Sequence, residues 1–204
     1  TMDRTHLKYT LSWAGLAGMV FVLVEVMTIV GVIGQYGLTT LVLIGINVIA
    51  AVGLNLVIGM SGQFSLGHAG FMAVGAYATA LIASAVPNIL GFGLSLIIGM
   101  GISGVIALLV GIPTLRLRGD YLAIATLGVA EIIRIVIINL KITRGPAGIF
   151  GIPNFVNWQM VFGLSVVVIV LVVNFVRSTT GQAIIAVRDN EIAAASLGIN
   201  TTKY

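Results

Sequence analysis

Two oppositely charged side chains stand three residues apart in an otherwise apolar stretch. Glu131 and Arg134 lie in DYLAIATLGVAEIIRIVIINL, residues 120–140. In a helix, residues three apart share a face, so the two charges can neutralise each other. Charged side chains inside a membrane segment are costly against lipid and mark functional sites by default. We therefore predict that this face points into the protein, where the pair either lines a solute pathway or holds its helix against neighbouring helices.

Three further polar side chains lie inside apolar runs. Asn47 and Asn55 are eight residues apart, about two helical turns, and therefore share a face. They are predicted to form hydrogen bonds between helices, with a polar pathway as the alternative. Glu25 has no partner within reach in the sequence. Its carboxyl group is expected to be protonated, to pair with another subunit, or to lie near the outer face of the membrane.

The stretch SGQFSLGHAGFMAVGAY, residues 61–77, places glycines and polar side chains between two apolar runs. Glycine weakens a helix by roughly 1 kcal/mol relative to alanine. Irregular backbone at membrane depth survives only where protein or a water-filled cavity satisfies its amides. The stretch therefore predicts either a tightly packed corner or a broken helix beside a pathway. The polar side chains that would serve a pathway there are Gln63, Ser65 and His68.

His68 has three possible roles. Metal binding is disfavoured because no other histidine or carboxylate stands at ligand spacing. A proton relay is the second, and a local hydrogen bond that fixes the corner is the interpretation we favour. In the same stretch, small residues at spacings of three and four predict a close helix contact; these are Ala69, Ala73, Ala76 and Ala80.

The sequence holds no recognisable catalytic set. It has no cysteine, and its two histidines, His6 and His68, have no nucleophile at a suitable spacing. The phosphate-binding pattern G-x-x-x-x-G-K-[ST] is absent. We therefore predict a chain that is no enzyme, holds no metal, binds no cofactor itself and does not hydrolyse ATP.

Composition defines the elements that must position these side chains. Of 204 residues, 59% are hydrophobic and only 8% are charged, whereas a soluble domain is about one quarter charged. An all-α polytopic membrane protein is the class that fits. The net charge of +4 comes from few, scattered residues, which indicates membrane topology and no nucleic-acid partner.

Six apolar stretches are long enough to cross about 30 Å of hydrocarbon at 1.5 Å per residue. We predict transmembrane spans near residues 12–33, 38–60, 65–85, 92–112, 121–140 and 158–176. Residues 1–11 then form a cytoplasmic N-terminus, residues 12–176 the transmembrane domain, and residues 177–204 a cytoplasmic segment.

Lysine and arginine set the predicted orientation, because cytoplasmic loops carry an excess of both. With a cytoplasmic N-terminus only Lys141 and Arg144 lie outside. The positive residues that then lie inside are Arg4, Lys8, Arg116, Arg118, Arg177, Arg188 and Lys203.

The last segment, RSTTGQAIIAVRDNEIAAASLGINTTKY, contains the signals of a short helix. Asp189 or Asn190 can cap its start, Glu191 suits its positive end, and Gly198 can close it. A helix of two turns is unstable alone in water. It must therefore dock, through Ile192 and Leu197, on a partner or on its own chain.

Four ordered stretches resemble a known family. EIAAASLG, residues 191–198, resembles the E-A-A…G signature of ABC importer permeases, whose loop forms a coupling helix in a groove of the ATPase subunit. The other three resemble the M-type permease of the branched-chain amino-acid ABC importer; they are GLNLVIGMSGQFSLGHAGFMAVGAYATA (53–80), TLRLRGDYLAIATLGVAEIIR (114–134) and ITRGPAGIFGIP (142–153). The resemblance covers roughly residues 38–204.

The resemblance implies a type II ABC importer-like permease in a prokaryotic inner membrane. Its implied partners are a second permease in a heterodimer, two ABC ATPases that carry ATP and Mg, an extracytoplasmic amino-acid-binding protein, and membrane lipid. The implied solutes are leucine, isoleucine and valine. The residues implied to couple to the ATPase are Arg188, Asp189, Glu191, Ala193, Ala194 and Gly198. Since relatives continue past this loop with further helices, the chain is expected to be truncated after Tyr204.

Three alternatives remain at this point. A permease of the same architecture for urea or short amides shares much of the pattern. A stand-alone channel or secondary transporter would need no ATPase partner. A structural membrane scaffold would carry no solute.

Overall fold

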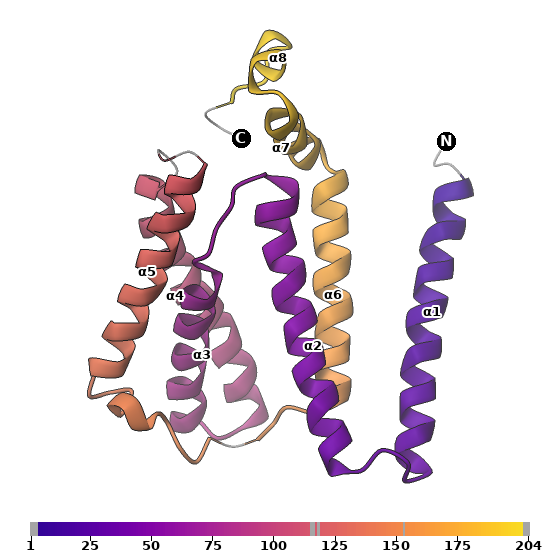
Figure 1. The fold of residues 1–204 in the computed structure, drawn as a ribbon. Helices are drawn as coiled ribbons and strands as arrows, with labels where there is room; N and C mark the ends of the chain where they lie inside the picture. The colour runs from indigo at the N-terminus through magenta and orange to yellow at the C-terminus, as the bar shows by residue number, and fades with distance from the viewer. Residues whose placement is uncertain (1–3, 115–116, 118, 153, 202–204) are drawn as a thin grey trace. The chain divides into compact units, whose positions relative to one another are not determined.

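Apolar runs form one long helix each, and glycine, proline and asparagine turns separate them (Figure 1). The computed structural model describes residues 4–114, 117, 119–152 and 154–201, and side chains from residue 13 on except that of residue 14. Of the residues used to predict orientation, Arg116, Arg118 and Lys203 lie outside this description, as do the side chains of Arg4 and Lys8. Pro153 and Tyr204 also lie outside it.

Each predicted span corresponds to one helix. The elements are α1 (Arg4–Ile29), α2 (Gln35–Asn55), η1 (Leu56–Met60), α3 (His68–Ala85), α4 (Ile89–Thr114), α5 (Asp120–Asn139), η2 (Gly145–Ala147), α6 (Trp158–Arg177), α7 (Thr179–Asp189) and α8 (Glu191–Ser196). The described residues contain no strand, so the all-α class is confirmed.

Five helices are long and apolar enough to cross a membrane. They cover Gln35–Met60, His68–Ala85, Ile89–Thr114, Asp120–Asn139 and Trp158–Arg177. The described apolar part of α1, Gly15–Ile29, is shorter, so the first of the six spans stays a prediction. The chain is a multi-pass membrane protein.

The chain divides into two compact units, which are described separately. Unit 1 comprises Thr1–Gly53 and Val156–Ser178, and unit 2 comprises Leu54–Phe155 and Thr179–Tyr204. In unit 1 the rings of Phe21 and Trp158 have centroids 4.9 Å apart, which brings α1 against the start of α6. A Cβ on Gly45 of α2 would collide with Val161 of α6, so glycine allows these two helices to approach.

In unit 2, small residues join α3 to α4, but they are not the predicted alanines. The Ser103 hydroxyl donates to the Phe71 carbonyl at 2.8 Å, and the Thr79 hydroxyl donates to the Ser95 carbonyl at 3.3 Å. A Cβ on Gly99 would come within 3.0 Å of the Gly75 carbonyl. Of the predicted alanines, Ala69 and Ala76 are exposed and Ala73 and Ala80 are half-buried.

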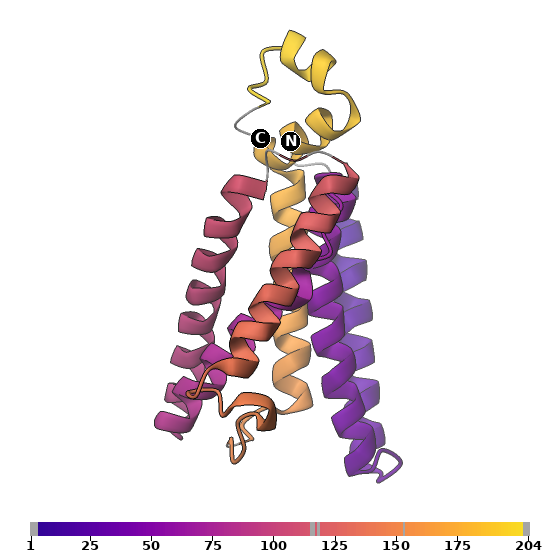
Figure 2. The same cartoon turned by 60° about the vertical axis from the view of Figure 1, so that its left-hand side comes forward.

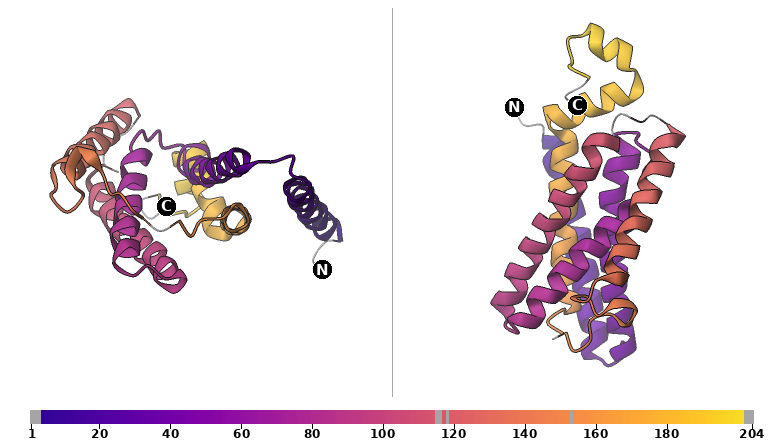
Figure 3. Two further views of the ribbon diagram at one scale, coloured as in Figure 1. Left: turned by 90° about the horizontal axis from the view of Figure 1, so that it is seen from below. Right: turned by 90° about the vertical axis from the view of Figure 1, so that its left-hand side faces the viewer.

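The start of α3 packs against α5 through two glycines. A Cβ on Gly67 would stand 2.9 Å from the Thr126 carbonyl oxygen, and a Cβ on Gly70 would stand 2.8 Å from the Ala130 Cα. Both distances are too short for a side chain, so only glycine permits this approach. Figure 2 and the right-hand view of Figure 3 show α4 and α5 running in opposite directions.

Within unit 2, several segments gather at one end. The end of α4, the start of α5, η1, α7 and α8 lie there, while η2 lies at the opposite end (Figure 1). The sequence predicted a helix only from residue 191 on, and α7 was missed. The reason is that its eleven residues contain polar positions and a glycine, which give a weak local helix signal.

Candidate functional site

The polar corner begins where α2 changes its helical geometry. Residues Leu56–Met60 form a π-helical turn, η1. Its wider spacing is visible in the hydrogen bonds from Ser61 N–H to the Leu56 carbonyl and from Gln63 N–H to the Val57 carbonyl, both 3.3 Å. Gly62 closes the turn with φ +68, a conformation that favours glycine. Such π-helical turns are rare and frequently occur at functional sites.

The loop 61–67 is held by backbone donors. Leu66 N–H donates to the Thr126 hydroxyl of α5 at 3.0 Å, and Gly67 N–H donates to the Ser65 hydroxyl at 3.4 Å. Gln63, Ser65 and His68 are half-buried. The loop between α2 and α3 is irregular, and the packed corner and the broken helix beside a pathway both stay predictions.

His68 starts α3 without the predicted hydrogen bond. Among the described residues, the hydrogen bonds that hold this corner come from the backbone amides of Leu66 and Gly67, and none comes from the His68 ring. The role of His68 stays a prediction.

Arg188, in the last turn of α7, reaches this corner. One guanidinium nitrogen donates to the Gly59 carbonyl of η1 at 2.6 Å. The other two donate to a carboxylate oxygen of Asp189 at 2.9 and 2.6 Å. A Cβ on Gly62 would stand 2.6 Å from the Arg188 Cγ, so the stem of the side chain lies against the loop.

The predicted capping of α8 is confirmed. The Asn190 side chain accepts a hydrogen bond from Ala193 N–H at 3.0 Å, so Asn190 and not Asp189 caps the start. At the other end Gly198 has φ +84, and Ile199 N–H donates to the Ala194 carbonyl at 3.1 Å. This pattern is a Schellman motif, which fixes the end of a helix.

The residues implied to couple to an ATPase are placed differently from one another. Ala194 is 2% exposed, so its side chain faces the chain itself. Arg188 is engaged with Gly59. Arg188 is nevertheless exposed, as are Asp189, Glu191, Ala193 and Gly198. The apolar side chains of Ile192 and Leu197 are 80% and 82% exposed, so they do not dock on the described chain.

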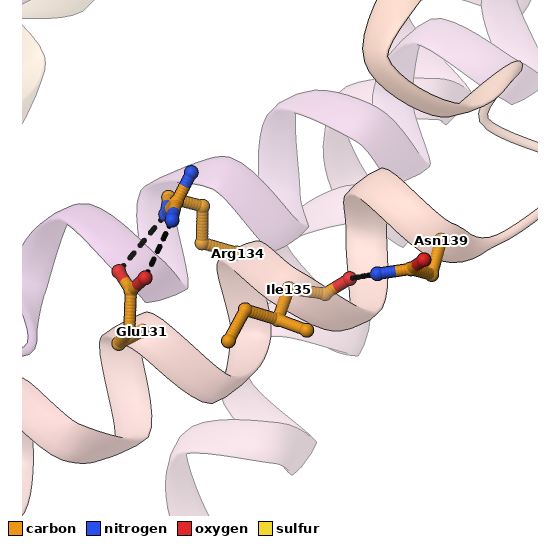
Figure 4. A network of polar contacts seen from close by, with 4 residues as sticks. All are labelled: Glu131, Arg134, Ile135 and Asn139. Carbon is orange, nitrogen blue, oxygen red and sulfur yellow. Dashed lines mark hydrogen bonds and ion pairs between the residues drawn. The ribbon is translucent and has the colours of Figure 1, made fainter.

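Glu131 and Arg134 form the ion pair that their spacing predicts. The two Arg134–Glu131 hydrogen bonds measure 2.9 and 2.5 Å, and Figure 4 shows the side chains reaching toward each other along their own helix. The side chains are 52% and 60% exposed. Both bonds stay within α5. Among the described residues of unit 2 the pair makes no bond to another helix, and its two predicted roles, lining a pathway or holding α5 against neighbouring helices, stay predictions.

The remaining polar side chains of the spans act locally. The Asn47 amide donates to the Leu43 carbonyl of its own helix at 2.9 Å, and the Asn55 oxygen covers Gly59. Both asparagines are exposed, so the predicted bonds between helices are not formed within the described chain. One carboxylate oxygen of Glu25 is buried without a hydrogen-bond partner among the described residues.

Three contacts were not predicted from the sequence. Arg188 donates to the Gly59 carbonyl and lies against Gly62, and Leu66 N–H donates to the Thr126 hydroxyl. Gly59 and Gly62, on either side of the start of the polar loop, were the available signal. No local pattern connects them to a residue far along the chain. No group of three or more metal-ligating side chains occurs in the part of the chain that the structure describes.

Comparison with known proteins identifies the family. The family described as "Branched-chain amino acid transport system / permease component" matches residues 36–204. The chain is similar to the "High-affinity branched-chain amino acid transport system permease protein LivM" of Salmonella typhimurium, with 38% identity over 47% of this chain and 31% of the relative. It is similar to the LivM protein of Escherichia coli, with 37% identity over 45% of this chain and 30% of the relative.

The chain spans about a third of the length of these relatives, 31% and 30%. No solved structure matches it. The family match covers the polar corner, the charged face of α5 and the capped C-terminal helix. The chain therefore belongs to the family of permease components of branched-chain amino acid transport systems.

Proposed function

We propose that this chain is part of the membrane-spanning subunit of an ATP-driven importer of leucine, isoleucine and valine. Family membership and the names of the two LivM relatives support this solute class. The permease has no ATPase site or other catalytic role of its own in this proposal. ATP and Mg are bound by partner subunits.

The observation that carries the proposal is the form of α8. This helix is fixed at both ends by Asn190 and Gly198, yet it presents Ile192 and Leu197 almost fully exposed. Exposed apolar side chains on a rigid element are typical of a protein interface. At six residues, about 9 Å, α8 is too short to cross a membrane. It is therefore suited to be the coupling helix that an ATPase holds.

The remaining partners follow from the same proposal. They are a second permease subunit, two ABC ATPases and an extracytoplasmic amino-acid-binding protein, in a prokaryotic inner membrane. The N-terminus is cytoplasmic in this proposal. The placement of η1, α7, α8, the end of α4 and the start of α5 at one end of unit 2 supports a common side for these segments (Figure 1), as the proposed topology requires.

Reconstitution of the full-length permease with its partners tests the proposal. We expect ATP-dependent uptake of radiolabelled leucine into proteoliposomes, with competition by isoleucine and valine and none by urea. Competition by urea would favour the short-amide alternative. Uptake without ATP or ATPases would favour a channel or secondary transporter, and no flux of any solute would favour a scaffold.

Variants of α8 test the coupling role. Glu191→Lys and Ile192→Glu place a new charge on the exposed side of α8, and we expect each to lower leucine uptake and retention of the ATPase during purification. Thr180→Glu adds a negative charge to the exposed side of α7, as Ile192→Glu does on α8, and is the matched control for that variant. Unchanged uptake and unchanged ATPase retention in both α8 variants would contradict the coupling assignment.

A further inference from the structure

Arg188 binds a distant segment of its own chain, a contact that binding to an ATPase alone would not require. Its guanidinium donates to the carbonyl of Gly59, 129 residues earlier in the chain, at 2.6 Å. Gly59 lies in the π-helical turn η1 that ends α2. The last carbonyls of a helix lack partners within the helix, and a cation is favoured at that end. Arg188 therefore caps the end of α2 from a distant segment.

The same side chain contacts the residue just beyond that helix end. Gly62 has φ +68, and a Cβ there would come within 2.6 Å of the Arg188 Cγ. The stem of Arg188 thus lies against Gly62 while its head binds Gly59. Because Arg188 contacts both Gly59 and Gly62, it holds the end of η1 and the start of the following loop together.

Asp189 orients the guanidinium. Two of its three nitrogens donate to one Asp189 oxygen at 2.9 and 2.6 Å, which leaves the third directed to Gly59. The planar, five-donor guanidinium suits this division, whereas a lysine ammonium would act as a single point charge.

The position of Arg188 in the chain links this contact to any movement of α8. Arg188 is in the last turn of α7, two residues before Asn190, which caps α8. A displacement of α8 therefore acts on the turn that holds Arg188. Beyond η1, the loop 61–67 is bound to α5 by the Leu66–Thr126 hydrogen bond at 3.0 Å. A continuous set of contacts runs from α8 through Arg188 to α2, α3 and α5.

We propose that Arg188 is a positioning residue that passes the movement of α7 and α8 into the π-helical end of α2. It acts inside the permease and is not a contact to the ATPase. Such turns are rare and frequently occur at functional sites, and η1 is the element of α2 that Arg188 contacts. This inference rests on the proposed function, because it assigns a role in coupling ATP hydrolysis to transport.

The first test measures leucine imported per ATP hydrolysed by the full-length complex in proteoliposomes. We expect Arg188→Ala to lower this ratio about tenfold, within the usual range of coupling between sites. ATPase retention on purification should be unchanged. Arg188→Lys, which keeps a positive charge but replaces the planar guanidinium by a compact ammonium group, should recover part of the ratio. An unchanged ratio in Arg188→Ala would overturn the inference, and so would loss of the ATPase from the complex.

A second measurement does not depend on transport. Amide hydrogen exchange over residues 56–63 in the purified complex should be faster in Arg188→Ala than in the wild type, with exchange in α4 unchanged. If the wild-type complex failed to import leucine but this difference were present, the proposed function would fail, whereas the contact of Arg188 with η1 would be supported. Equal exchange in residues 56–63 would contradict that contact whatever the transport result.

Gly62→Asn gives an independent variant. Asparagine tolerates positive φ better than other residues with a Cβ, so its main effect is the collision with Arg188. Gly31→Asn is the matched control, because Gly31 also closes a helix with φ +79 but has nothing within 4 Å of its Cβ position. We expect Gly62→Asn to lower leucine per ATP severalfold and Gly31→Asn to leave it unchanged. The effect of Gly62→Asn should be smaller in the Arg188→Ala background, and equal effects in both backgrounds would contradict the proposed contact.

Discussion

Two arginines of this permease pair with a carboxylate close by in sequence, yet their surroundings differ. Arg188 pairs with Asp189 and extends to a backbone carbonyl 129 residues away. Arg134 pairs with Glu131 one turn earlier, and both hydrogen bonds remain within α5. The first pair is completed by its own chain. The second stands on the open face of a helix long enough to cross the membrane.

The difference shows what each pair requires. An ion pair at the end of the spans can be solvated by water. The Asp189–Arg188 pair therefore contributes mainly by orienting the guanidinium toward the Gly59 carbonyl. An ion pair midway along a spanning helix cannot be left against lipid without cost. We therefore predict that the α5 face is covered by a polar pathway or by protein. The two pairs are consequently expected to respond differently to the same chemical change.

The largest effect is expected from removing one member of the α5 pair. Arg134→Ala leaves the Glu131 carboxylate uncompensated in a spanning helix, and we expect a severalfold fall in the amount of permease in the membrane. The double variant Glu131→Arg with Arg134→Glu restores the pair in reverse order. Immunoblots of isolated membranes measure the amount.

Transport by the reversed pair distinguishes its two roles. If the amount recovers and leucine uptake recovers with it, the pair only neutralises charge within the protein. If the amount recovers and uptake does not, the face lines the pathway. No recovery of the amount would mean that Glu131 and Arg134 do not act as a pair.

The next effect tests whether the α5 face is open in the assembled transporter. Gly70→Val places a Cβ 2.8 Å from the Ala130 Cα, on the packed side of α5. Overpacking of this kind costs about 1–3 kcal/mol, so we expect a lower temperature of unfolding in detergent. Gly128→Val makes the same change on α5 where nothing lies within 4 Å. In the isolated permease it should have little effect beyond helix propensity, and an equal loss of stability would contradict the observed packing.

Gly128→Val also reports on the complete complex. Loss of the second permease during purification of this variant would identify the α5 face as a subunit interface. Retention of the second permease together with reduced uptake would identify it as pathway. The matched change at Gly70 controls for general damage to the helix pair.

The features that could be predicted from the sequence depend on local signals. Six helices follow from apolar runs of about twenty residues, and the caps at Asn190 and Gly198 follow from residue type and spacing. The Glu131–Arg134 bond follows from a separation of three residues on a helix. Each of these is decided within one or two turns of the chain.

The features that were missed depend on distant residues. Spacing predicts that Glu131 and Arg134 meet, but not that their face is uncovered, because coverage depends on other helices. The contact of Arg188 with Gly59 and Gly62 joins segments more than a hundred residues apart. Gly67 and Gly70 read as helix-weakening residues, whereas Thr126 and Ala130 of α5 require them.

A moderate effect is expected at the start of α8. Asn190→Ala removes the acceptor for Ala193 N–H, and the loss of such a cap costs about 0.5–2 kcal/mol. We expect faster amide exchange in residues 191–197 and weaker retention of the ATPase, with exchange around Glu131 and Arg134 unchanged. Asn190→Asp, which keeps a capping oxygen, is the control and should behave as the wild type. Equal exchange in Asn190→Ala and Asn190→Asp would show that the cap does not hold α8.

The smallest effect is expected from neutralising the carboxylate beside Arg188, and the same change in α5 makes it informative. Asp189→Asn keeps an oxygen that can accept from the guanidinium, and an exposed ion pair is worth about 0.2–1 kcal/mol. Leucine per ATP should therefore fall less than in Arg188→Ala, because the bond to Gly59 remains.

Glu131→Gln is the same substitution in a spanning helix, and there it leaves Arg134 charged without a carboxylate. We expect Glu131→Gln to lower the amount of permease in membranes while Asp189→Asn does not. If Asp189→Asn were as damaging as Arg188→Ala, the ion pair and not the Gly59 contact would be the essential interaction at this junction, and the contrast between the two arginines would fail.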